Sequence, residues 1–152
     1  TRYWRDWSSG VCSSDLDGMS GGWAYTFTLS AEASIVEIQF DYRVRLAANT
    51  EDDEYAEMIV SLEDGINKKR NVIGRVRGDG NGGEDRGLTG TSELTTFDSV
   101  TAGNHTVTIG GYMNQKTHDN EFVRVLIDNV SITAIGSAPP TPPLRNRLRH
   151  SV

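Results

Sequence analysis

The chain has 152 residues, a formal net charge of −6 at pH 7 and a single cysteine, Cys12. An acidic surface repels the phosphate backbone and disfavours nucleic acid as a partner, and one cysteine excludes a disulfide framework within the chain. No apolar run approaches the ~18 residues of a membrane-crossing helix, so no membrane span is expected. This length suits a single domain with one core.

The first sixteen residues differ in character from the rest. RDWSSGVCSSDL, residues 5–16, has neither the alternation of a strand, nor the period of a helix, nor the charged start and apolar run of a signal peptide. It resembles the conceptual translation of a short-read sequencing adapter, departing from it at Gly10, where that translation has Asp. We therefore treat residues 1–16 as a non-native segment and expect the domain, residues 17–136, to lack its first strand.

Alternating apolar and polar residues predict strands along the domain. WAYTFTL, residues 23–29, places four apolar side chains on one face, and VEIQFDYRVRL, residues 36–46, keeps the alternation over its whole length. EYAEMIVSLEDG, residues 54–65, ends in an Asp64–Gly65 turn. Its expected inward face consists of Ala56, Met58, Val60 and Leu62. Shorter strands are expected at residues 72–76, 89–94 and 105–109.

The last predicted strand, residues 121–135, has apolar residues on both faces, which indicates a central strand. About seven strands separated by Gly, Asn and Asp turns, with no long helical pattern, predict an all-β fold, an antiparallel two-sheet β-sandwich. DDEYAEMIVS, residues 52–61, is similar to DNEFVRVLID, residues 119–128. Both strands are therefore expected to begin at the same end of the sandwich, unless each simply follows an ordinary polar turn.

The carboxyl-terminal segment, residues 137–152, contains all four prolines of the chain and three of its arginines. Proline-rich runs cannot join a sheet ladder and favour extended polyproline conformation. Residues 137–143 are therefore interpreted as a linker and the remainder as a basic tail. This predicts that the domain is a module of a larger multidomain protein and has neighbouring domains as partners.

Motifs for catalysis are absent from the sequence. There is no G-x-S-x-G, and the three histidines show no metal-ligand spacing. The nearest approach to a pair of glycosidase carboxylates is Glu37 with Asp41 on the polar face of one strand, and we interpret both as surface charges. RGDGNGGED, residues 77–85, lacks the Gly and Glu positions of an EF-hand and is interpreted as a glycine-rich loop. The sequence thus predicts that the protein is not an enzyme.

A resemblance to known domains lies in the second half of the chain. TAGNHTVTIGGYMNQKT, residues 101–117, followed by VRVLIDNVSI, residues 123–132, resembles the closing strands of jelly-roll carbohydrate-binding modules and galactose-binding-like domains. The resemblance covers residues 101–133 and implies a jelly-roll type of sandwich. In those families a structural calcium often bridges the first and last strands, and Asp128 matches the carboxylate that the last strand supplies.

Glycan recognition by such sandwiches needs exposed aromatic rings for stacking on sugar faces and planar polar groups for binding hydroxyls. The predicted ligand-binding residues are Tyr112, Asn114, Gln115, Tyr55 and Asn120. The alternative for Tyr112 is a residue at the rim of the core.

Calcium is the predicted cofactor, in a structural role. The loops at residues 51–54 and 119–121 offer the mixture of carboxylate and amide oxygens that this ion prefers. The predicted ligands are Asp53, Glu54, Asp119 and Glu121 for a loop site, and Asp128 for the separate site that the resemblance implies. The alternative is that both acidic loops are solvated turns.

These observations together predict a secreted or cell-surface, non-catalytic module that binds a polysaccharide or cell-surface glycan. The alternative is a structural spacer or adhesin domain that only positions its neighbours, and a third interpretation is a fragment of a sandwich-fold glycoside hydrolase.

Overall fold

The computed structural model describes residues 21–80, 86–115, 117 and 120–136, which form seven β-strands and no helix. The strands are β1 (Gly21–Leu29), β2 (Ala33–Leu46), β3 (Tyr55–Glu63), β4 (Lys68–Arg77), β5 (Arg86–Val100), β6 (Gly103–Met113) and β7 (Val123–Gly136). The predicted adapter-derived segment, the proline-rich linker and the basic tail lie outside the described residues. No helix long and apolar enough to cross a membrane occurs within the described ranges.

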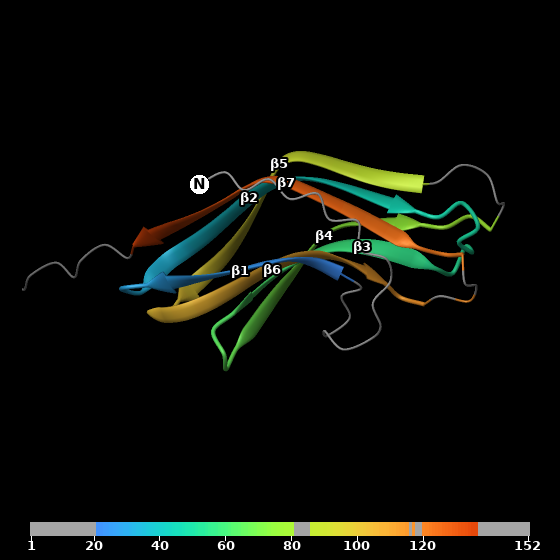
Figure 1. Ribbon diagram of the computed structural model, residues 1–152. Helices are drawn as coiled ribbons and strands as arrows, with labels where there is room; N and C mark the ends of the chain where they lie inside the picture. The colour runs from blue at the N-terminus through green and yellow to red at the C-terminus, as the bar shows by residue number, and fades with distance from the viewer. Residues whose placement is uncertain (1–20, 81–85, 116, 118–119, 137–152) are drawn as a thin grey trace, which may run out of the picture.

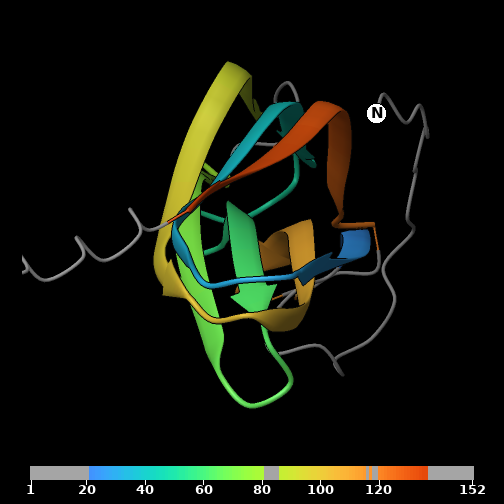
Figure 2. The same ribbon diagram turned by 90° about the vertical axis from the view of Figure 1, so that its left-hand side faces the viewer.

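The strands form two antiparallel sheets that pack face to face, as Figure 1 shows. One sheet has the order β1-β6-β3-β4 and the other the order β5-β2-β7. Only β3 and β4 follow each other within one sheet, and every other connection crosses to the opposite sheet. Figure 2 shows the β3–β4 hairpin, in green, extending beyond the sandwich. The predicted antiparallel two-sheet β-sandwich is confirmed.

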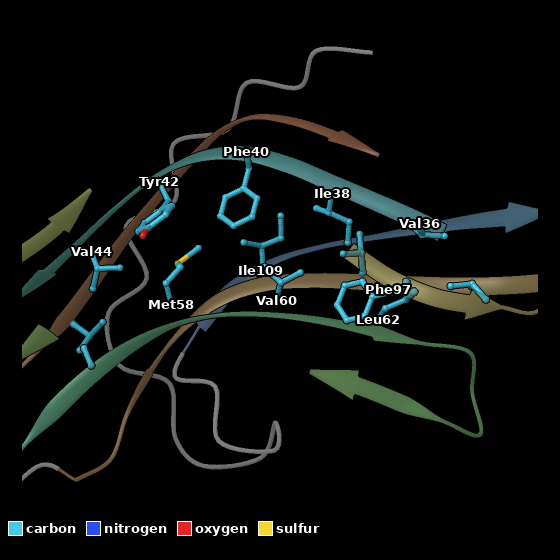
Figure 3. Packing of buried hydrophobic residues seen from close by; sticks show 14 of the residues in the cluster. Val36, Ile38, Phe40, Tyr42, Val44, Met58, Val60, Leu62, Phe97 and Ile109 are labelled. Carbon is cyan, nitrogen blue, oxygen red and sulfur yellow. The ribbon is translucent and has the colours of Figure 1, made fainter. Parts of the chain in front are cut away.

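The core lies between β2 of one sheet and β3 and β6 of the other (Figure 3). From Val36 to Leu46 every second residue of β2 is buried, because side chains of a strand alternate between its two faces. The buried set on β2 is Val36, Ile38, Phe40, Tyr42, Val44 and Leu46. Ala56, Met58, Val60 and Leu62 of β3 face them, so the predicted inward faces of both strands are confirmed.

The prediction that residues 121–135 form a central strand is wrong for the described strands, because β7 lies at the end of its sheet beside β2. The apolar residues on both faces have another cause. Asn129 has a φ of 52° and lies where the β2–β7 register shifts. Val125 and Ile127 pack against the core before this bulge, whereas Val130 and Ile132 do so after it. The bulge therefore exchanges the two faces of the strand.

The predicted turn after β3 is confirmed. Gly65 has a φ of 86°, a conformation that glycine adopts without steric cost. The Asp64 carboxylate accepts hydrogen bonds from the backbone N–H groups of Ile66 at 2.9 Å and Asn67 at 2.6 Å. These bonds, the one from Asn67 above all, lower the pKa of Asp64 to about 2. The turn is thus held by a charged acceptor.

Candidate functional site

The candidate site lies on the outward face of the four-stranded sheet. In Figure 1 both sheets bend in the same direction with this sheet on the inner side, so its outward face is concave. The part of this face nearest β1 carries hydroxyl and amide groups: Thr26 Oγ1 is 3.0 Å from Thr106 Oγ1, and Thr28 Oγ1 donates to Asn104 Oδ1 at 2.7 Å. The part formed by β3, β4 and the end of β6 carries aromatic and charged side chains.

Five of these side chains form a connected cluster, the tyrosine–arginine platform, which consists of Tyr55, Glu57, Arg70, Arg75 and Tyr112. The register places Tyr112 of β6 and Arg75 of β4 on either side of Glu57 of β3. The two tyrosine rings meet edge to face, with centroids 6.3 Å apart. The Arg75 guanidinium lies 4.1 Å from the centroid of the Tyr55 ring, and that of Arg70 lies 5.7 Å from the centroid of the Tyr112 ring. Both are within the range of cation–π attraction.

Glu57 joins the two arginines. Its carboxylate accepts from Arg75 Nε at 2.9 Å and from an Arg70 amino group at 3.4 Å. The side chain of Glu57 is only 5% exposed, whereas those of Arg70 and Arg75 are 40% and 49% exposed. Hydrogen bonding to Glu57 is the main cause that raises the pKa of Arg75. The carboxylate is therefore enclosed and the cations remain accessible.

Arg70 reaches this position by crossing the face of the sheet. In register it lies opposite Ser61, yet its guanidinium contacts Glu57, and the residue between these two on the same face of β3 is Ile59. Ile59 is fully buried although it does not belong to the core cluster between the sheets. The aliphatic stem of Arg70 thus covers an apolar residue while its charged end stays exposed, as long cationic side chains commonly do.

The structure brings four of the five predicted ligand-binding residues together. Tyr55 and Tyr112 belong to the platform, and Asn114 borders it: Asn114 Oδ1 accepts from Tyr55 N at 2.6 Å. Gln115 Nε2 donates to Asp53 Oδ2 at 2.8 Å, which fixes the adjoining loop. Tyr112 contacts Tyr55 and Arg70 on the outward face rather than the rim of the core.

Asn120, the fifth predicted ligand residue, lies in a different network. Its Oδ1 accepts from Asn49 Nδ2 at 2.9 Å. Ala47 N also donates to Phe122 O at 3.0 Å, so the segment that follows β2 contacts the one that precedes β7. Strands β3 and β7 therefore begin at the same end of the sandwich, as the similarity of the two sequence stretches predicts.

The predicted metal ligands are spread over this end. Glu54 is completely buried, its Oε2 accepts from Glu51 N at 2.9 Å, and its Oε1 has no hydrogen-bond partner in the part of the chain that the structure describes. Glu121 is 1% exposed and accepts from Thr117 N at 2.7 Å. Asp53 is exposed, and Asp119 lies outside the described residues. Within the described ranges, no group of three or more His, Cys, Asp or Glu side chains is placed to hold a metal ion.

Asp128 lies apart from the loop residues. It is paired in register with Asp41 on the central strand β2, and its Oδ1 accepts from Asn129 N at 2.7 Å. Asp128 is five residues into β7, about 17 Å along an extended strand from its first residue. A loop site and an Asp128 site would thus be separate locations, as the sequence predicts.

Sequence reasoning missed three members of the platform: Glu57, Arg70 and Arg75. The signal that could have found the two arginines is the alternation of cations in KKRNVIGRVR, residues 68–77, which extends the strand beyond the apolar stretch at residues 72–76.

Comparison of the chain with protein-family models, with curated proteins and with solved structures yields no significant match.

Proposed function

We propose that the domain is a non-catalytic glycan-binding module of a secreted or cell-surface protein, and that the outward face of the four-stranded sheet is its binding surface. The observation that carries this proposal is the tyrosine–arginine platform. It holds two half-buried aromatic rings beside planar, charged hydrogen-bonding groups on a concave face. Sugar rings present apolar faces to aromatic side chains and hydroxyl groups to planar polar ones, so both halves of the recognition are available here.

The platform is prepared for binding before a ligand arrives. Arg70 and Arg75 are each held by a ring and by Glu57, so they lose little conformational freedom when they bind a ligand. The threonine and asparagine side chains near β1 extend the polar surface beside the platform. A chain of several sugars, rather than a single one, suits a surface of this extent.

Affinity electrophoresis against a panel of soluble polysaccharides tests the proposal. At least one polysaccharide should retard the domain, and Tyr112→Ala should weaken that binding by about tenfold, which corresponds to about 1.4 kcal/mol. Tyr25→Ala is the matched control, because Tyr25 is a 41% exposed ring on β1 outside the platform. Circular dichroism of each variant establishes that it is folded.

Two results would contradict this function. Absence of retardation across the panel would favour a structural spacer or adhesin domain without its own ligand. Equal loss of binding in Tyr112→Ala and Tyr25→Ala would place the binding surface elsewhere.

We further propose that calcium stabilises the loop end of the domain, with Glu54 as a ligand. The supporting observation is Glu54 Oε1, a fully buried carboxylate oxygen that has no hydrogen-bond donor among the described residues. A buried charged oxygen without a partner is costly, and a cation would remove that cost. Glu121 is the other enclosed carboxylate at this end, and backbone carbonyls of the adjoining loops would complete an oxygen shell.

Thermal melts in millimolar calcium and in excess chelator test this second proposal. Binding to the folded state alone raises the melting temperature, so calcium should increase it and Glu54→Gln should abolish the increase. Asp128→Asn should leave the increase intact. Identical melts of the unmodified protein in both conditions would show that the loops are solvated turns. Loss of the increase in Asp128→Asn alone would place the ion on β7.

A further inference from the structure

Four cations occupy the outward face of β4, and we call Lys68, Arg70, Arg75 and Arg77 the basic stripe. Register places them opposite residues of the outward face of β3: Arg77 opposite Tyr55, Arg75 opposite Glu57, Arg70 opposite Ser61 and Lys68 opposite Glu63. Val72 lies between the two pairs and is 51% exposed. The stripe therefore follows the edge strand β4 and shares Arg70 and Arg75 with the tyrosine–arginine platform.

The other side chains of β4 point toward the second sheet. Lys69 Nζ donates to the carbonyl oxygen of Asp98, and Asn71 Nδ2 donates to Thr95 Oγ1 at 2.7 Å, both on β5. Because the side chains of a strand alternate between its two faces, one lysine of β4 contacts the second sheet and four cations face outward. The strand presents a charged surface in one direction only.

The positive charge of this face is not balanced by its acidic residues. On the strands of this face, within the described residues, the carboxylates are Glu57 and Glu63, so four cations against two anions leave a net charge of +2 on these strands. Arg70 and Arg75 share Glu57, and Arg77 has no ion pair among the described residues. The whole chain carries a net charge of −6. A local positive surface on an acidic protein directs anions to that place.

Protection of a sheet edge against aggregation does not account for the stripe. Lysines on edge strands do prevent pairing with other chains. However, β1 forms the opposite edge of the same sheet, and its sequence GGWAYTFTL contains no charged residue. The cations are concentrated on the edge that adjoins the two tyrosines.

We propose that the glycan bound at this face is anionic, with carboxylate or sulfate groups bound by the basic stripe and sugar rings lying against Tyr55 and Tyr112. This inference rests on the proposed glycan-binding function. Guanidinium groups bind carboxylate and sulfate through paired hydrogen bonds, and Arg75 and Arg70 are already oriented by the platform.

The charge of the rest of the chain favours a polysaccharide over a nucleic acid as the anionic ligand. Double-stranded DNA carries one charge per ~1.7 Å, and the acidic remainder of the protein would repel it.

The test compares anionic with neutral polysaccharides and includes one matched pair, in which methyl esterification removes the charge. Polygalacturonate and its fully methyl-esterified form are run in affinity electrophoresis, together with alginate, hyaluronate and heparin as anionic probes and xylan, mannan and mixed-linkage glucan as neutral ones. At least one anionic probe should bind at least tenfold more tightly than every neutral one, and added salt should weaken that binding. Arg77→Gln and Lys68→Gln should each lower the affinity several-fold. Arg43→Gln, which removes an exposed cation from β2 in the other sheet, should not change it.

The outcomes separate the two proposals. Equal or tighter binding of a neutral polysaccharide would overturn the anionic assignment and leave glycan binding in place. Failure of every probe would overturn both. Binding of a single-stranded oligonucleotide as tight as that of the best anionic polysaccharide would also overturn the assignment, because the face would then be a nucleic-acid site. Unchanged affinity in Arg77→Gln and Lys68→Gln would exclude the stripe as the anion-binding element.

Discussion

Asp41 and Asn129 lie 88 residues apart in the chain, and Asn129 Nδ2 donates to Asp41 Oδ2 at 2.5 Å. The other oxygen of the same carboxylate, Oδ1, accepts from Ser92 N at 2.6 Å. Ser92 and Asn129 have φ values of 53° and 52° and lie at the register shifts on either side of β2. One carboxylate on the central strand therefore fixes a bulge in each neighbouring strand. Bulges bend a sheet, and Figure 1 shows this sheet bent along its length.

Replacement of Asp41 tests this arrangement. Asp41→Ala removes the acceptor for both bulges and should lower the melting temperature, whereas Asp41→Asn keeps one oxygen acceptor and should lower it less. The hydrogen bonds from Ser92 and Asn129 lower the pKa of Asp41, so the carboxylate, not the neutral acid, is the form that they stabilise. Glu37→Ala is the control, because Glu37 lies on the same face of β2 four residues earlier. Equal effects of Asp41→Ala and Glu37→Ala would contradict this role.

These bulges are also the feature of the fold that the sequence pattern does not predict. Alternation located the strands and the inward faces of β2 and β3, because a half-buried strand imposes a period of two on its apolar residues. It misjudged β7, because one extra residue at Asn129 moves every later side chain to the opposite face. Such a bulge depends on a hydrogen bond that Asn129 donates to Asp41, a residue distant in the chain, so no local pattern around Asn129 reveals it.

The candidate site was predictable only in part, again because contacts between residues distant in the chain leave no local pattern. Tyr55, Tyr112 and Asn114 were identified by residue type, since aromatic and amide groups outside the apolar pattern indicate a ligand surface. Glu57 and its two arginines come together only through the registers of β3 with β4 and β6. Register is a long-range property, and the bulge between Met58 and Ile59 shifts it further. Asn120 was grouped with the ligand residues by its position in a loop, yet it bonds to Asn49.

The Asp64 turn gives the protein a specific acid dependence. The pKa of Asp64 falls from an ordinary 3.8 to about 2 in the folded state, because the carboxylate accepts backbone hydrogen bonds from Asn67 and Ile66. A lowered folded-state pKa contributes stability above the unfolded-state value and loses it as the pH falls through the folded-state value. Asp64→Asn keeps an acceptor but cannot ionise.

Urea denaturation at a series of pH values measures this contribution. The unmodified protein should be more stable than Asp64→Asn above about pH 4, and the difference should shrink as the pH falls from about 4 towards 2. A difference that stays constant over this range would mean that the charge of Asp64 does not stabilise the turn.

Gly78 directly follows β4 and packs against the acidic loop that contains Glu54. Gly78 N donates to Glu54 O at 3.0 Å, and a Cβ at this position would collide with the backbone carbonyl oxygens of Thr50 and Glu51. Backbone atoms cannot rotate away as a side chain can, so Gly78→Ala should destabilise the protein by about 1–3 kcal/mol. Gly136→Ala is the matched control, because a Cβ there meets nothing within 4 Å, and its effect should stay within about 0.5 kcal/mol.

Chemical denaturation of both variants measures the two values. Equal stability of Gly78→Ala and Gly136→Ala would show that the backbone of the loop before β3 moves to accept a Cβ without cost. The buried position of Glu54 would then not depend on this contact.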